Sequence, residues 1–119
     1  MPAILAGCIN IGVKTCFVVA YSNGSVRLYQ PDTGSLLAEV GAHSRQINGL
    51  ACHPAQGLFA TCADDSFMNV WKVTPEGNVT IMSSSRVPDF QLTGVCFAGK
   101  FSQSVVASVY DYKQLIVWD

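Results

Sequence analysis

The sequence predicts an all-β fold made of about three repeated antiparallel sheets, each with four short strands. Three observations predict it. Apolar residues fall in short runs rich in β-branched and aromatic side chains, turn residues separate these runs, and similar segments recur at a nearly constant spacing. No segment keeps the 3.6-residue period of an amphipathic helix.

The predicted strands number eleven, each roughly four to eight residues long and bounded by Gly, Pro, Asn or Asp. They cover residues 3–9, 16–21, 25–29, 35–40, 46–52, 58–63, 67–73, 79–83, 92–97, 104–110 and 114–118.

The connections between these strands carry hairpin signals. Asn23-Gly24 is typical of a type I′ turn, and residues 31–34 and 75–78 each hold a proline followed by a glycine. We therefore expect consecutive strands to pair in antiparallel fashion.

Two independent markers repeat along the chain. Large aromatic residues end three similar runs, and they stand 42 positions apart from Tyr29 to Trp71 and 47 apart from Trp71 to Trp118. Segment 47–52 also matches segment 92–97 at an offset of 45. A four-stranded repeat of about 40 to 45 residues is typical of a β-propeller blade. The sequence thus predicts a β-propeller fragment with blades at 3–40, 46–83 and 92–118, the last one lacking its outer strand.

Two of the runs, 16–20 and 58–62, are apolar at successive positions, which predicts burial of both strand faces. A closed propeller has at least four blades, because each blade is covered only by its two neighbours. Three blades leave two apolar faces and an open strand edge. We expect these surfaces to meet the missing blades, supplied by another segment or by copies of the same chain.

The composition narrows the classes of function. Half of the residues are hydrophobic and only 13% are charged, which favours surfaces that other protein covers. Seven Lys and Arg stand against eight Asp and Glu without clustering, so no basic stripe predicts a nucleic-acid partner. No run reaches the roughly 20 apolar residues of a membrane helix, and we expect a cytoplasmic protein without membrane insertion.

The five cysteines form no C-x-x-C pair and each lies within an apolar run. Their pattern favours buried, reduced thiols over a disulfide framework or a zinc site. The sequence predicts no metal and no cofactor.

Several segments together resemble the WD40 repeat family. The resemblance lies in the run from His43 to Pro54, in residues 58–65, in Val70-Trp71-Lys72, and in the family dipeptide Trp118-Asp119. It implies a propeller whose last outer strand is commonly supplied by the N-terminal end of the same protein.

The resemblance also implies a hydrogen-bonded unit inside the middle blade. In the family a His, a Ser or Thr, an Asp and a Trp form this unit, and His43, Asp65 and Trp71 stand at matching positions. The hydroxyl residue is expected two positions before Asp65, where the sequence has Ala63. We therefore predict a shortened network in which the imidazole meets the indole N–H.

No catalytic motif stands in the sequence: it has no phosphate loop, no H-E-x-x-H and no G-x-S-x-G. The resemblance favours a scaffold that binds other proteins. The alternative is a structural subunit of a larger permanent assembly, such as a coat, ciliary or vesicle-associated complex. Partners are expected on the loops that precede the innermost strands and on the turns that follow the second strands. The residues there of the types that anchor interfaces are Arg45, Phe67, Arg86, Phe90 and Tyr112.

Overall fold

A computed structural model describes residues 2–12 and 14–119, and its described residues form eleven strands and no helix. The first sheet holds β1 (Ala3–Ile11), β2 (Lys14–Tyr21), β3 (Ser25–Tyr29) and β4 (Leu36–Gly41). The middle sheet holds β5 (Ile47–Cys52), β6 (Leu58–Ala63), β7 (Phe67–Val73) and β8 (Val79–Arg86). The third holds β9 (Leu92–Ala98), β10 (Ser104–Val109) and β11 (Ile116–Trp118).

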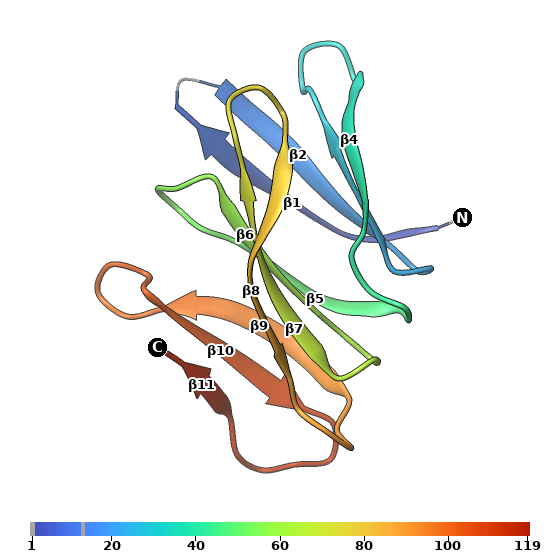
Figure 1. The fold of residues 1–119 in the computed structure, drawn as a ribbon, viewed down its shortest axis with the longest axis vertical. Coiled ribbons are helices and arrows are strands. Elements are labelled where there is room, and N and C mark those ends of the chain that lie inside the picture. Colours follow the sequence, from blue (N-terminus) through green and yellow to red (C-terminus); the bar gives the residue numbers. More distant parts are fainter. Residues whose placement is uncertain (1, 13) are drawn as a thin grey trace.

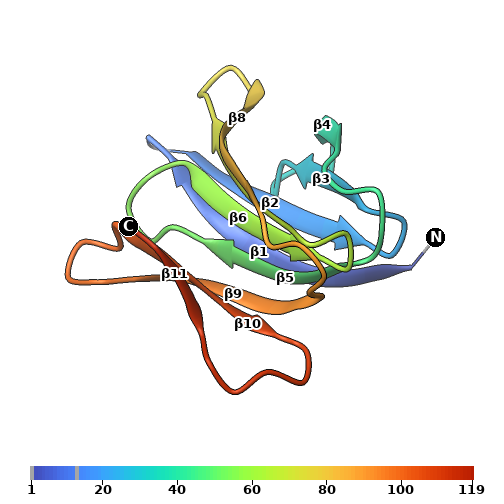
Figure 2. The ribbon, with the colours of Figure 1, turned by 60° about the horizontal axis from the view of Figure 1, so that its bottom comes forward.

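The sheets are arranged as the sequence predicts for a propeller fragment. Strands pair antiparallel in chain order within each sheet, and the third sheet has three strands instead of four. The first strands of the three sheets, β1, β5 and β9, lie side by side, while β4 and β8 lie far from them (Figures 1 and 2). The all-β fold with a three-stranded last sheet is confirmed.

The strands β6 and β7 of the middle sheet are buried on both faces, whereas its outer strand β8 is largely exposed. Along β6, Phe59 and Ala63 pack into a core shared with the first sheet, whereas Ala60 and Cys62 pack into a core shared with the third. Successive side chains of a strand point to opposite faces, so a strand between two neighbours needs apolar residues at every position. This explains the unbroken apolar run at residues 58–62.

The outer sheets are covered on one face only. In β2, Cys16 and Val18 are buried against the middle sheet, but Phe17 between them keeps 44% of its surface exposed. The predicted burial of residues 16–20 is therefore met on one face only in this chain, because no described sheet packs on the far side. Cys8 and Cys96 are also exposed rather than buried, while all five cysteines are free thiols.

The free edge of β11 lies beside a groove of about 500 Å³ between the middle and third sheets. Its lining includes Val70, Met82 and Trp118, and Met82 is 58% exposed. In the middle sheet a fourth strand, β8, occupies the place next to β7. The apolar surface of Met82 is thus left open where the third sheet has no fourth strand.

One predicted turn differs in type. Gly24 has a φ of 93°, but Asn23 is not among the residues with positive φ, whereas a type I′ turn requires positive φ at both. Instead the Gly24 N–H donates to the Tyr21 carbonyl (3.1 Å). The chain therefore makes one more residue of turn before β3, which brings Gly24 against the loop at His43.

Candidate functional site

Five loops of the molecule form one hydrogen-bonded row, which we call the loop rim: residues 22–24, 42–46, 64–66, 87–91 and 110–115. The Gly24 carbonyl accepts from Ala42 and His43 N–H (3.0 Å each), and the Gln46 carbonyl accepts from Asp64 N–H (3.1 Å). The row continues from Ser66 to Val87 and from Gln91 to Tyr110 through main-chain bonds of 2.8 and 2.9 Å, respectively. In Figure 1 the rim follows the lower right edge of the molecule.

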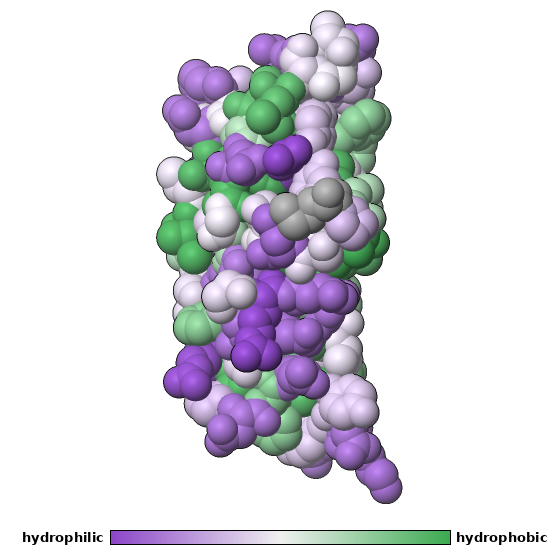
Figure 3. All heavy atoms as spheres, turned by 90° about the vertical axis from the view of Figure 1, so that its right-hand side faces the viewer, coloured by the Kyte–Doolittle hydropathy of each residue, from purple (hydrophilic) through white to green (hydrophobic). Residues whose placement is uncertain are grey.

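The surface on that side is mixed in polarity. Figure 3 faces the right-hand side of Figure 1 and shows polar residues gathered around its centre, with apolar patches above them, below them and at both sides. A mixed composition is compatible with an interface, because interfaces as a whole are about as apolar as the rest of a protein surface.

A buried polar network supports the rim from inside the middle sheet. The His43 Nδ1 lies 3.0 Å from both carboxylate oxygens of Asp65, and its Nε2 lies 2.7 Å from the Thr61 Oγ1. The Trp71 indole N–H donates to the same Thr61 oxygen (3.0 Å). His43, Thr61 and Trp71 are all buried, so each bond satisfies a group that burial would otherwise leave unpaired.

The network corrects two expectations. The hydroxyl member is present, but it is Thr61, four positions before Asp65. Ala63 pairs with Ile47 across the β5–β6 ladder and belongs to the apolar core. The imidazole does not meet the indole N–H, because the Thr61 oxygen lies between them. The signal for Thr61 was a lone hydroxyl inside the apolar run 58–63.

Hydrogen-bond roles in this network follow from counting protons. A neutral His43 donates from Nδ1 to Asp65 and accepts the Thr61 hydroxyl proton at Nε2, which leaves the Thr61 oxygen free to accept from Trp71. Burial lowers the pKa of His43 below its usual 6.5, opposed by the nearby Asp65 carboxylate. Every N–H and O–H donor of this network therefore has an acceptor when the imidazole is neutral.

Asp65 also fixes the rim directly. Its carboxylate accepts from the backbone N–H groups of Ser44 (3.1 Å) and Phe67 (3.0 Å). It thus ties the loop before β5 to the turn before β7, the two segments that carry Arg45 and Phe67.

A second polar bridge, which the sequence did not predict, joins the middle and third sheets. The Asn48 side-chain amide donates to Asp64 (2.6 Å) and to the Leu92 carbonyl (2.9 Å). Gly49 allows this close approach, because a Cβ there would lie 2.9 Å from the Val95 nitrogen. The adjacent Asp64 and Asp65 have different partners, so neither is part of an acid pair.

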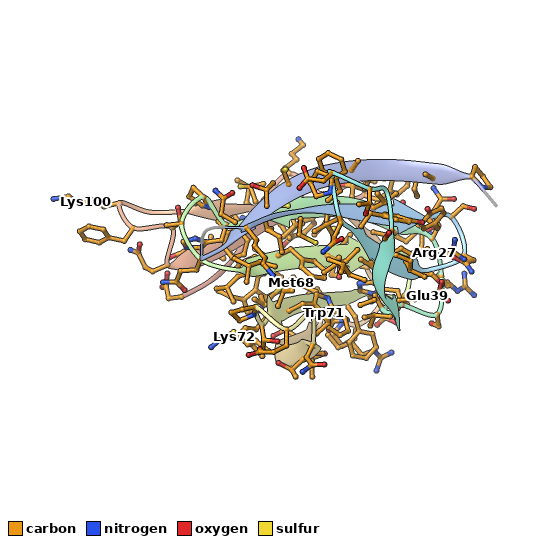
Figure 4. The ribbon with its side chains drawn as sticks, turned by 90° about the horizontal axis from the view of Figure 1, so that it is seen from above. Arg27, Glu39, Met68, Trp71, Lys72 and Lys100 are labelled. Carbon is orange, nitrogen blue, oxygen red and sulfur yellow. The ribbon has the colours of Figure 1, made fainter. Side chains whose placement is uncertain are left out.

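The first sheet keeps only a fragment of this network. Asn23 stands in the place of Asp65, and its side chain accepts from the Ser25 N–H (3.0 Å) as Asp65 does from Phe67. Tyr29 replaces the Trp, and its hydroxyl lies 2.8 Å from that of Tyr21. Arg27 lies over the Tyr21 ring and forms an ion pair with Glu39. Figure 4 shows Arg27 and Glu39 next to each other.

The rim loops hold Arg45, Phe90 and Tyr112, and the other two predicted partner residues, Phe67 and Arg86, lie at the strand ends next to the rim. Four of the five form pairs. Phe67 and Arg86 are register partners at the ends of β7 and β8. The Phe90 and Tyr112 rings lie in contact, with centroids 5.2 Å apart and a tilt of 49°. Arg45 is exposed in the loop before β5.

The described residues hold no group of three or more potential metal ligands. His53 is a turn residue, because its Nδ1 accepts from the N–H groups of Ala55 and Gln56 (3.1 and 3.0 Å). No helix in the described part of the chain is long and apolar enough to cross a membrane.

The family model WDR54 matches residues 1–118. WD repeat-containing protein 54 of Mus musculus is 32% identical over 98% of the chain and 36% of its own length. The protein of the same name from Homo sapiens is 31% identical over 80% of the chain and 30% of its own length. The chain thus spans about a third of these curated relatives.

A solved structure shares the fold. The crystal structure of the Cps50 (Swd1) β-propeller domain of Myceliophteria thermophila superposes with a TM-score of 0.77 at 14% identity, covering 87% of the chain and 34% of that domain. At this identity the match shows the architecture alone.

Proposed function

The chain belongs to the WDR54 family, and on this premise we propose that it is part of a propeller platform that binds other proteins through the loop rim. The main support for this proposal is the continuous row of hydrogen-bonded loops. Along the edge that this row forms lie Arg45, Phe67, Arg86, Phe90 and Tyr112. Loops held by a rigid scaffold favour binding, because little conformational entropy is lost when a partner docks. The proposal assigns no catalytic step and no cofactor to the chain.

A pull-down with matched variants tests the platform. Arg45→Ala and Phe67→Ala are expected to reduce partner capture, because Arg and aromatic residues carry much of the energy of protein interfaces. Lys100→Ala and Phe101→Ala are the controls, since they change an exposed cation and an exposed aromatic on the β9–β10 hairpin, which lies on the opposite side of the molecule from the rim (Figure 1). Equal capture by rim and control variants contradicts the platform.

We further propose that additional blades cover the two open faces and the free edge of β11. The support is the exposed Phe17 on the first sheet, the exposed Met82 beside β11, and relatives about three times as long as this chain. A fourth strand paired with β11 would cover Met82. It would complete the third sheet in the way that β8 completes the middle sheet. The covering segment is either another part of the same protein or a second copy of the chain.

Sedimentation of the chain at micromolar concentration tests this coverage. We expect self-association, and Phe17→Ser is expected to weaken it because that substitution removes apolar surface from an open face. Phe90→Ser is the matched control at an exposed phenylalanine that lies in the loop rim and not on an open face. A stable monomer at this concentration contradicts the proposal.

A structural subunit of a permanent assembly is the second candidate function, and the open apolar faces favour it. Obligate interfaces are larger and more apolar than those of exchanging partners. Co-purification with one partner that resists high salt supports this function. Salt-sensitive, micromolar binding to several partners supports an exchanging platform.

A further inference from the structure

The end of the rim at the third sheet carries an aromatic pair with a fixed position. The Phe90 and Tyr112 rings are in contact, yet 37% and 46% of these residues remain exposed. They come from loops 87–91 and 110–115, which the Tyr110 N–H joins by donating to the Gln91 carbonyl (2.9 Å). The pair thus presents aromatic surface to solvent without depending on a flexible tail.

Further bonds hold both rings. The Ser66 hydroxyl donates to the Phe90 carbonyl, and the Phe90 N–H donates to the Val87 carbonyl (3.3 Å). The Tyr112 hydroxyl donates to the Gln114 side chain (3.2 Å). A surface that is ordered before binding loses less entropy when a ligand docks.

An exposed carboxylate precedes each ring in the chain. Asp89 and Asp111 have left-handed backbones, with φ of 68° and 53°, a conformation that Asp tolerates better than most residues. Within residues 2–12 and 14–119 neither carboxylate forms an ion pair, whereas Asp64 and Asp65 are engaged with Asn48 and His43. Each ring of the aromatic pair is thus preceded in the chain by an exposed carboxylate that has no ion pair.

The local charge is complementary to a cation. Segments 88–91 and 110–115 contain Asp89 and Asp111 but a single cation, Lys113, so their net charge is −1; the exposed Arg86 is the next cation along the chain. Aromatic faces attract cations, and the planar guanidinium of arginine both stacks on rings and pairs with carboxylates. The combination of rings and free carboxylates favours an arginine side chain over an apolar one.

From this juxtaposition we propose that Phe90, Tyr112, Asp89 and Asp111 form a pocket for an arginine side chain on an extended segment of a partner protein. The inference rests on the proposed platform function and names the chemistry of one partner contact. The rings stack on the guanidinium, and the carboxylates accept its N–H donors.

Amide NMR of the whole chain tests the pocket with defined probes. The probes are two short peptides of the same sequence, one with a central arginine and one with citrulline, its uncharged isostere. We expect saturable shifts at Phe90 and Tyr112 with the arginine peptide, with a Kd of about 1 mM, as suits a single side chain. The citrulline peptide should bind about tenfold more weakly, because it lacks the charge that both contacts need.

Variants separate the two kinds of contact. Asp89→Asn and Asp111→Asn keep a residue that tolerates the left-handed backbone and remove only the charge, so each should weaken binding about two- to fivefold. Phe90→Ala with Tyr112→Ala should abolish the shifts, and Lys113→Gln should strengthen binding. Phe101→Ala is the control and should leave the affinity unchanged. The amide spectrum of each variant also reports whether it folds.

Equal affinity for the two peptides, or none at about 5 mM, overturns the pocket. Unchanged binding by both asparagine variants overturns it as well. Partner capture that is lost with Arg45→Ala but kept with Phe90→Ala and Tyr112→Ala refutes this pocket and leaves the platform intact. If the pocket variants lose arginine binding but every rim variant still captures the partner, the platform is refuted instead.

Discussion

Replacing Thr61 with valine removes the hydroxyl that joins Trp71 to His43 and keeps the shape of the side chain. The structure shows that this oxygen accepts the indole N–H at 3.0 Å and lies 2.7 Å from the imidazole Nε2, with Thr61 fully buried. Thr61→Val leaves one donor and one acceptor unpaired, and each such group costs about 1–3 kcal/mol. Because the added methyl group offsets part of this cost, we expect a loss of about 2–4 kcal/mol in the free energy of unfolding.

Urea unfolding followed by tryptophan fluorescence measures this loss. With a slope of about 2 kcal/mol per molar urea, the midpoint should fall by about 1–2 M. Thr61→Ser keeps the hydroxyl and should cost only about 1 kcal/mol for the lost methyl group. Thr93→Val is the exposed control, since the Thr93 hydroxyl bonds to Ser108 on an open face. A Thr61→Val variant within about 0.5 kcal/mol of the parent chain refutes the network as a source of stability.

The remaining predictions concern protonation, backbone conformation and thiol access. Burial holds the pKa of His43 below 6.5 in the folded chain, so below that pH the unfolded chain binds more protons than the folded chain. The contribution of His43 to stability is therefore present above pH 6.5 and declines as the pH falls toward the folded-state pKa. Urea midpoints between pH 8 and pH 5 should show this decline, and His43→Gln should reduce it. Gly24→Ala should lower the free energy of unfolding by at least about 2 kcal/mol in thermal unfolding, since Gly24 has positive φ and the new Cβ would lie 2.1 Å from the His43 carbonyl oxygen. Gly12→Ala is the control, because Gly12 also has positive φ but lies in open space, and it should cost about 1 kcal/mol. Mass spectrometry after brief alkylation should find Cys8 modified in the folded chain and Cys62 protected, since Cys62 is buried and its pKa is raised to about 12; equal labelling would contradict the open face.

The strands and their repeat were predictable because both depend on local patterns. All eleven predicted runs are strands, with differences only at their ends, such as β1 reaching Ile11 and β8 reaching Arg86. Hairpin-forming turns and apolar runs act over a few residues, so one sequence suffices to find them. The turn at Asn23-Gly24 was assigned the wrong type because its geometry depends on the contact between Gly24 and the distant His43 loop.

The candidate site was predictable in part. Residue spacing and the family resemblance indicated His43, Asp65 and Trp71, which the structure brings into one network through Thr61. The error at Ala63 has a geometric origin. Thr61 and Ala63 are two positions apart and therefore point to the same face of the strand, so only the position of the imidazole decides which of them it reaches. The contact between Phe90 and Tyr112 has no local signal either, since 22 positions separate the two rings in the chain.

The sequence by itself determined the strand content, the blade period and the apolar character of the sheets, because these follow from side-chain alternation and turn chemistry within a few residues. Tertiary structure alone decided which apolar faces are covered and which polar atoms meet. Phe17 and Phe59 are both phenylalanines in apolar strands, yet the first is exposed and the second buried, because only Phe59 faces a neighbouring sheet. Burial and hydrogen bonding depend on the atoms that lie within a few ångströms of a side chain. Those atoms belong to a remote part of the chain or to another chain.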